Sequence, residues 1–259
     1  MKIYCLGTMD CFPVKGNDSS SYLIDGHILI DTSYATVNNL LNGGYDPLNI
    51  DTVIITHWHF DHYAGLAELL YYIYFHRSED LKNRLTIICP PQGAKETVSA
   101  AIEYFRLSDA KLSICKREAI GFPNMIELDE CGEINYGEYN IKYVSASHPV
   151  DGRCYRITDS MGKCIGLSGD TSYKEDIVPL FSGVDLLLFE ASYGVKDIAP
   201  DNPNGHCSAH DAGRVAQKSN AKQLAIVHSR HEREKLFECA SEYYKGEIIC
   251  PISGNELVI

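Results

Sequence analysis

The run Thr56-His57-Trp58-His59-Phe60-Asp61-His62 directly follows the apolar stretch Val53-Ile54-Ile55. It places three imidazoles and one carboxylate within six residues, and divalent zinc, iron and manganese accept both kinds of ligand. Because strand side chains repeat every two residues, His57 and His59 point the same way at a strand end and can hold one ion. The aspartate and histidine beyond the turn can face a second ion. With only 10 histidines in 259 residues, an accidental cluster is the weaker interpretation, and the run predicts two adjacent metals.

Composition and charge narrow the class of substrate. The chain is 45% hydrophobic and 22% charged, which is ordinary for a globular protein. Its net charge is −12, and two divalent cations would reduce this to −8 (−12 + 4). An acidic surface does not attract polyanions at long range, so a small substrate is expected and a long nucleic acid is not.

The cysteines and the apolar runs indicate the compartment. Ten cysteines are scattered without a C-x-x-C pair, which disfavours a zinc ribbon or a thioredoxin-type motif. Cys89, Cys164 and Cys250 lie in apolar runs and are expected to be buried, reduced thiols. The first seven residues resemble a strand and not an export signal, and the longest apolar stretch, near residues 66–75, is too short to span a bilayer. We therefore expect a cytoplasmic protein with no membrane segment.

Strand-like and helix-like segments alternate along the whole chain. Strands are predicted at residues 1–7, 20–24, 27–30, 53–55, 85–89, 139–144, 154–157, 163–167, 185–189, 224–227 and 247–249. Helices are predicted at residues 64–75, 93–105, 209–218 and 233–244. No linker or low-complexity segment interrupts this order. The simplest packing is a single domain over residues 1–259, with sheets inside and helices outside.

Further candidate ligands stand where later strands are predicted to end. Asp31, His148, Asp170 and His228 each follow an apolar run, at positions where loops gather to form sites. A single polar residue at a strand end is commonly only a turn former. Four of them together with the histidine cluster form a pattern, and the pattern predicts that they converge.

These residues, in this order, resemble the motifs of the metallo-β-lactamase superfamily over about residues 20–230. The resemblance implies an αββα sandwich, in which two mixed β-sheets pack face to face between helices, with a di-metal site at one edge. It implies ligands as follows: His57, His59 and His148 for the first ion; Asp61, His62 and His228 for the second; Asp170 as the bridge; and Asp31 behind them, accepting the other N–H of a ligand imidazole. The expected ions are two zinc ions, with manganese or iron as alternatives.

Two late stretches resemble one branch of this superfamily. Phe189-Glu190-Ala191-Ser192 and the segment from Gly205 to Gly213 are similar to accessory motifs of ribonuclease Z-like phosphodiesterases. The resemblance pairs Glu190 with His206 near the scissile phosphate, and a carboxylate-held imidazolium can protonate a leaving oxygen. Asp61 and Asp170 would position the nucleophile. The alternative is that Glu190 is an ordinary strand-end acid and His206 an ordinary loop residue. A true β-lactamase is disfavoured, because Asp170 stands where a cysteine ligand would be.

The substrate is expected to be small. Only 21 residues separate His148 from Asp170, which leaves no room for the tRNA-binding arm of ribonuclease Z. A cyclic nucleotide or another small phosphodiester fits better, and members of the branch often form homodimers. Two alternatives stay open: a thioester or lactone hydrolase, which needs no Glu190–His206 pair, and a non-catalytic metal-binding protein.

Several other residues have two possible roles. Tyr71, Tyr72 and Tyr74 could form a wall on which bases stack, although their helical spacing favours a core or interface role. Arg153 and Arg230 could contact a phosphate or form surface ion pairs.

Overall fold

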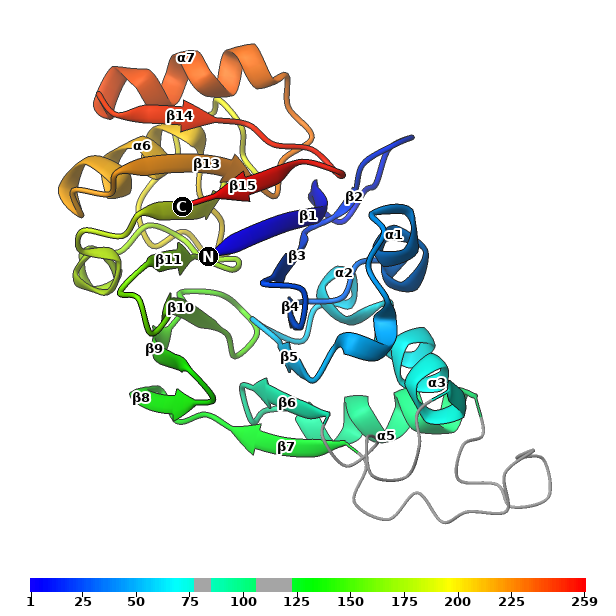
Figure 1. Cartoon of the computed structure of the whole chain (residues 1–259). Coiled ribbons are helices and arrows are strands. Elements are labelled where there is room, and N and C mark those ends of the chain that lie inside the picture. Colours follow the sequence, from blue (N-terminus) through cyan, green and yellow to red (C-terminus); the bar gives the residue numbers. More distant parts are fainter. Residues whose placement is uncertain (77–84, 106–122) are drawn as a thin grey trace.

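Two β-sheets pack face to face, and helices cover the outer surface of each sheet (Figure 1). The computed structural model describes residues 1–76, 85–105 and 123–259. Strands of the first half of the chain, with the final strand, make one sheet, and strands of the second half make the other. The predicted αββα arrangement is confirmed.

The first sheet has the strand order β15-β1-β3-β4-β5-β6-β7, with β2 paired to β1. Strands β4 to β7 run parallel, whereas β15, β1, β3 and β4 are antiparallel neighbours. The strands are β1 Lys2–Met9, β2 Asp18–Ser19, β3 Ser21–Ile24, β4 Ile28–Ile30, β5 Thr52–Ile54, β6 Thr86–Cys89, β7 Asn124–Glu127 and β15 Glu256–Val258. The helices are α1 Thr36–Asn42, α2 Phe60–Tyr63, α3 Leu66–His76 and α5 Ala94–Tyr104, with a 3-10 turn at Pro47–Asn49.

The second sheet has the order β14-β13-β12-β11-β10-β9-β8. Its strands β11 to β14 run parallel, and β8 to β11 are antiparallel neighbours. The strands are β8 Cys131–Tyr136, β9 Tyr139–Ser145, β10 Arg153–Thr158, β11 Cys164–Leu167, β12 Leu186–Glu190, β13 Gln223–Val227 and β14 Glu247–Ile249. The helices are α6 Ala209–Lys218 and α7 Arg233–Tyr243, with a 3-10 helix at Glu175–Phe181.

Three apolar layers follow from the two-residue period of the strands. In β4, Ile28 and Ile30 face the layer between the sheets, whereas Leu29 faces the layer under α1 and α3. In β12, Leu188 likewise faces inward and Phe189 packs under α6 and the 3-10 helix. Because both faces of these central strands are buried, their sequences are continuously apolar.

Every predicted strand and helix has a counterpart, with ends displaced by a few residues. Strands β2, β7, β8 and β15 and helices α1 and α2 were not predicted. Strand β8 is a largely exposed edge strand, so it lacks the apolar signal of a buried strand. Helix α1 contains three asparagines in seven residues, and its start is held by Asp18, whose carboxylate accepts from Ala35 N and Asn39 Nδ2.

Arg153 forms an ion pair, one of its two predicted alternatives, but from a buried position. Its guanidinium is almost completely buried and donates to the carbonyls of Leu128, Asp129 and Gly152. Its backbone N–H donates to Thr56 O at 2.8 Å, which joins β10 to the loop carrying the histidine cluster. Its guanidinium also pairs with the partly exposed Asp151 carboxylate, so the ion-pair alternative is confirmed, with the arginine itself buried. Arg153 thereby joins the two sheets at the site.

The described cysteines are free, and five of them are buried, Cys89 and Cys164 among them. Cys250 is only partly buried and follows β14, so the expectation of a buried strand position is wrong there. Among residues 1–76, 85–105 and 123–259, no helix combines the length and the apolar composition needed to cross a bilayer.

Candidate metal centre

The site forms where strands of both sheets end at a common edge. Parallel β4 and β5 lead to Asp31 and the histidine cluster, and parallel β11 and β13 lead to Asp170 and His228. Strand β9 runs in the same direction as β11 and leads to His148. All the predicted ligand side chains therefore come together, although they span residues 57–228.

Three of these strand ends share an unusual backbone. Asp31, Gly169 and His228 have φ of 51°, 57° and 51°, in the left-handed region. A residue other than glycine in this region costs about 1–2 kcal/mol, so the surrounding contacts must hold Asp31 and His228 there. At position 169 a Cβ would lie 2.9 Å from Thr56 Cβ, which explains the glycine before Asp170. The turned backbone aims the polar side chains of Asp31, Asp170 and His228 into the space between the sheets.

His57, His59, His148 and Asp170 form the first group of candidate ligands. His59 Nδ1 lies 3.1 Å from His57 Nε2 and 2.9 Å from His148 Nε2. Burial lowers the pKa of all three imidazoles, so they are neutral with free lone pairs at pH 7. Ring nitrogens that face one another at this distance need a shared proton or cation between them.

Asp61, His62 and His228 form the second group. His62 Nε2 is 3.2 Å from His228 Nε2, and Asp61 Oδ2 lies 3.4 and 3.3 Å from these two nitrogens. Burial alone would raise the pKa of Asp61, but the hydrogen bonds from His228 and His62 hold it well below its usual range. Asp61 is therefore an anion directed at the ring nitrogens.

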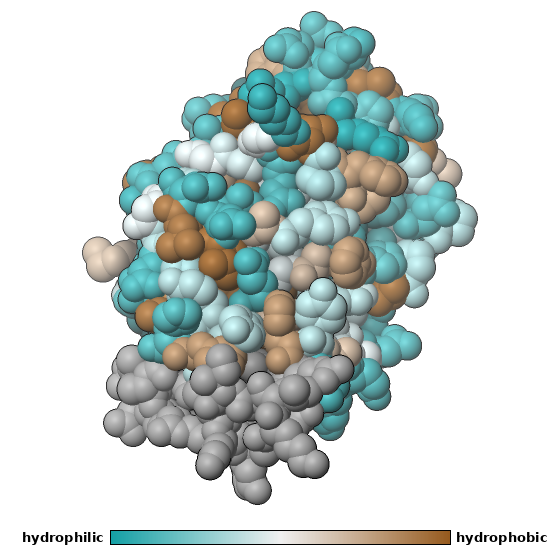
Figure 2. All heavy atoms as spheres, turned by 90° about the vertical axis from the view of Figure 1, so that its right-hand side faces the viewer, coloured by the Kyte–Doolittle hydropathy of each residue, from teal (hydrophilic) through white to brown (hydrophobic). Residues whose placement is uncertain are grey.

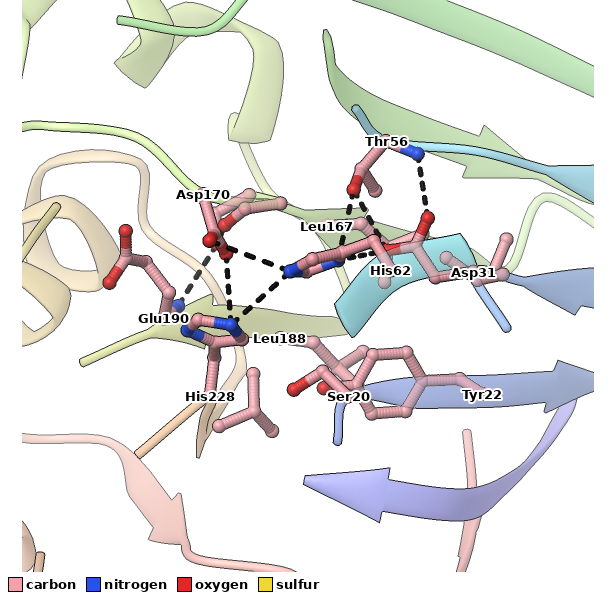
Figure 3. Close-up of a pocket in the computed structure, with 14 residues that line it drawn as sticks. Ser20, Tyr22, Asp31, Thr56, His62, Leu167, Asp170, Leu188, Glu190 and His228 are labelled. Atoms are coloured by element: carbon pink, nitrogen blue, oxygen red, sulfur yellow. Dashed lines mark hydrogen bonds and ion pairs between the residues drawn. The ribbon is translucent and has the colours of Figure 1, made fainter. Parts of the chain in front are cut away.

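Asp170 stands between the two groups. Its carboxylate oxygens lie 3.5 Å from His62 Nε2 and 3.4 Å from His228 Nε2 (Figure 3). They also lie 3.7 Å from His57 Nε2. Burial opposes ionisation, yet the charges of His228 and His62 keep the pKa of Asp170 well below its usual value. Among the described residues, its buried Oδ1 has no hydrogen-bond partner. An orphaned carboxylate oxygen among converging imidazoles fits a divalent cation.

The outward nitrogens of three imidazoles are fixed by hydrogen bonds. His62 Nδ1 donates to Asp31 Oδ2 at 2.7 Å, and His148 Nδ1 donates to the Gly205 carbonyl at 2.8 Å. His228 Nδ1 lies 2.7 Å from Ser192 Oγ, which also donates to the His228 carbonyl. Each bond occupies Nδ1 and directs Nε2 toward the centre, the orientation that metal-binding histidines require.

Sequence reasoning missed two supporting residues, Thr56 and Ser192. The Thr56 N–H and hydroxyl donate to Asp31 at 2.7 and 2.8 Å, which completes the ring of donors around that carboxylate. A signal existed for both, since Thr56 directly precedes the histidine cluster and Ser192 lies in the motif that includes Glu190. Their role depends on partners distant in sequence, which the motifs do not reveal.

We expect the Asp31→Asn variant to bind divalent metal roughly 10- to 100-fold more weakly, because the amide no longer orients His62 as a carboxylate does. Metal titration followed by calorimetry measures this directly. Asp25→Asn, a change of the same type in the turn after β3, is the matched control. Equal metal affinities for Asp31→Asn and the unmodified protein would contradict the orienting role.

Glu190 and His206 form a pair at the border of the site. His206 Nδ1 donates to Glu190 Oε1 at 2.9 Å, and Glu190 is held from behind by the N–H groups of Thr171 and Ser192. Burial alone would lower the pKa of His206, but its bond to Glu190 raises the pKa to about 9. A capping box at the start of α6, between Ser208 and Asp211, anchors the segment. The imidazolium is 24% exposed, so a ligand can reach it.

His206 also belongs to a third group of possible ligands, with Asp170 and His228. His206 Nδ1, which lies 3.8 Å from Asp170 Oδ2, is already bonded to Glu190 Oε1 at 2.9 Å. This bond favours a proton-carrying imidazolium over a ligand, because a metal ligand must be neutral.

A cavity of about 20 Å³ lies behind His62 and Asp170, with Tyr22 and Ser20 on its wall (Figure 3). This volume is about that of one water molecule, so the cavity cannot hold a substrate. A substrate must therefore approach from the opposite side, where His59 and His206 are partly exposed.

Comparisons with known proteins agree with this geometry. A family model described as the anti-Pycsar protein Apyc1 matches residues 1–193. The probable metallo-hydrolase YhfI of Bacillus subtilis is 27% identical over 98% of both chains, and ribonuclease Z of Anoxybacillus flavithermus is 25% identical over 93% of this chain and 91% of that protein.

Solved structures show the same fold. The crystal structure of YhfI, a metallo-β-lactamase fold protein, superposes with a TM-score of 0.78 at 24% identity, covering 99% of this chain and 98% of that one. The short form of human tRNase Z superposes with a TM-score of 0.75 at 19% identity, covering 100% and 99%.

Proposed function

The chain belongs to the family of the anti-Pycsar protein Apyc1, in the ribonuclease Z-like branch of the metallo-β-lactamase superfamily, and is a metal-dependent hydrolase; on this premise we propose that it hydrolyses a small phosphodiester such as a cyclic nucleotide. The predicted superfamily and hydrolase class are thereby confirmed. The observation that carries the proposed substrate class is the Glu190–His206 pair, which stands beside a cation site and can supply a proton.

We assign the residues of the site as follows: His57, His59 and His148 to one divalent ion; Asp61, His62 and His228 to a second; and Asp170 to both. The three-imidazole group suits zinc, and manganese or iron are compatible with the mixed nitrogen and oxygen donors. When bound, such ions polarise a phosphoryl oxygen and lower the pKa of water. The net charge of −12 makes two cations electrostatically favourable.

The chain's own residues supply positioning and proton transfer. The Asp61 and Asp170 carboxylates are buried anions, and they hold and orient an attacking water through their oxygens. His206 lies on the side from which substrate approaches, with its proton stabilised by Glu190. It donates that proton to the ester oxygen that leaves, because an alkoxide is a poor leaving group without one.

The size of the substrate is limited by the chain between His148 and Asp170. Strands β10 and β11 form an antiparallel hairpin with a short turn at residues 159–163, and nothing extends from it. This supports a compact phosphodiester over a folded tRNA. Because both sheets contribute ligands to one site, we propose that residues 1–259 act as a single catalytic domain; a homodimer stays a prediction.

A substrate panel tests this proposal. The unmodified protein, reconstituted separately with zinc, manganese and iron, is assayed on cyclic nucleotides, linear dinucleotides, a thioester and a lactone. We expect turnover of phosphodiesters with at least one metal, and about two ions per chain by elemental analysis. Turnover confined to the thioester or lactone would replace the proposal by its first alternative. Fewer than two ions per chain together with no turnover of any ester would favour the second alternative, a non-catalytic metal-binding protein.

A further inference from the structure

Three aromatic side chains lie on the surface beside the metal centre. Phe12 is 59% exposed, Phe60 is 58% exposed and Tyr34 is 36% exposed. The Tyr34 ring contacts Phe60 edge-on at 5.6 Å, and its hydroxyl donates to the Cys11 carbonyl at 3.0 Å, next to Phe12. We call these three residues the aromatic edge. They come from two loops and α2, and Tyr34 joins them.

The aromatic edge borders the candidate ligands directly. Phe60 lies between His59 and Asp61 in the chain, so its Cα is within about 4 Å of the Cα of each. Phe60 begins α2, the short helix that also carries Asp61 and His62. A phosphate held at the metal centre would therefore have the aromatic edge beside it.

A cation stands at the same border. The Arg230 guanidinium lies 5.0 Å from the centre of the Phe12 ring, and its Nε is 3.4 Å from Asp10 Oδ2. Arg230 is half exposed and follows His228 by two residues. In this acidic protein, an arginine stacked on an exposed ring next to a cation site is suited to an anionic ligand that also carries a flat ring.

Exposed aromatic rings elsewhere are not equivalent. On α3, Tyr74 is buried, Tyr71 packs on Phe75 and Phe105, and Tyr72 stacks on His76. These tyrosines therefore serve helix packing, the role that their helical spacing favoured over a base-stacking wall. On the face that carries α1 and α3, apolar side chains gather in small separate patches among hydrophilic ones (Figure 2). Continuity with the metal centre distinguishes the aromatic edge from such patches.

We propose that the aromatic edge is the binding site for the nucleobase of a nucleotide phosphodiester, with Phe12 and Phe60 as stacking residues that determine substrate selectivity. This inference rests on the proposed phosphodiesterase function. In this arrangement the leaving oxygen faces His206, and the base extends past Asp61 onto the exposed rings. Stacking tolerates any base, because every base has a π-face. The site therefore selects base-bearing esters and distinguishes poorly among purines and pyrimidines.

Two matched substrates test the inference. One is a nucleoside 3′,5′-cyclic phosphate; the other is the same cyclic phosphate of 1-O-methylribose, in which methoxy replaces the base. The measured quantity is the ratio of their kcat/KM values. We expect Phe12→Ala to lower this ratio about tenfold through the KM of the nucleotide, because the variant loses the ring on which the base stacks. Phe12→Tyr should restore the ratio.

Controls separate this result from general damage. Phe237→Ala removes a ring of similar exposure (47%) on α7 and should leave the ratio unchanged. Phe60→Ala should lower the ratio as Phe12→Ala does, with metal content measured in parallel because of its neighbours. An unchanged ratio in both aromatic variants overturns the inference and leaves the proposed function standing. Hydrolysis of neither cyclic phosphate by the unmodified protein, with turnover of a thioester or lactone instead, overturns the proposed function together with it.

Discussion

Asp170→Ala is expected to abolish turnover of every phosphodiester and to reduce the bound metal from about two ions to one or fewer. Asp170 is the only carboxylate of the described site whose oxygens lie within 4 Å of imidazoles from both ligand groups. Its removal would leave neither ion with its full set of ligands. The loss of kcat should be on the order of a thousandfold or more, beyond the roughly 10- to 100-fold expected when a residue behind a ligand is lost.

Elemental analysis and single-turnover kinetics on the same preparation measure this effect. Asp185→Ala is the matched control: its carboxylate is also largely buried and pairs with Lys222, at the opposite end of β12 from Glu190. Circular dichroism shows whether both variants are folded. An Asp170→Ala protein that is folded, holds two ions and keeps more than about a tenth of the activity would contradict the bridging role.

His206→Ala should slow hydrolysis of substrates with alkoxide leaving groups by about 10²- to 10⁴-fold, the usual contribution of a positioned general acid. A p-nitrophenolate leaving group departs without a proton, so its hydrolysis should change little. Metal content should stay the same, because His206 Nδ1 is bound to Glu190 and not to a ligand group. The slope of log kcat against leaving-group pKa is the measured quantity, and it should become steeper in the variant.

Glu190→Gln should reproduce part of this effect, since the amide cannot stabilise the imidazolium as a carboxylate does. His210→Ala is the matched control, because His210 lies on α6 and pairs with Glu242 away from the centre. Equal losses on good and poor leaving groups would refute the proton-donor role. Loss of an ion in His206→Ala would instead assign His206 to the third ligand group, with Asp170 and His228.

The histidine cluster could be predicted from local chemistry alone. Its spacing, its place after an apolar run and the polar residues at later strand ends follow from the two-residue period of strands and from ligand preference. The buried central strands and the long helices were recognisable for the same reason, since their apolar periodicity is strong. Edge strand β8 and helix α1 were not, because exposure and asparagine content remove that periodicity.

Tertiary structure decided the features that depend on partners far apart in the chain. The left-handed backbone of Asp31 and His228 is set by the packing of strand ends, and it could not be predicted from the conformational preferences of these residue types. The hydrogen bond between Ser192 and His228 joins residues 36 positions apart. The buried Arg153 side chain donates to the carbonyl of Asp129, 24 positions earlier. The aromatic edge likewise joins rings from residues 12, 34 and 60. The periodicity of a segment shows which of its faces is buried, whereas long-range contacts form only when the two sheets pack against each other. The local sequence therefore determined which residues are ligands, and the tertiary structure determined how they are oriented.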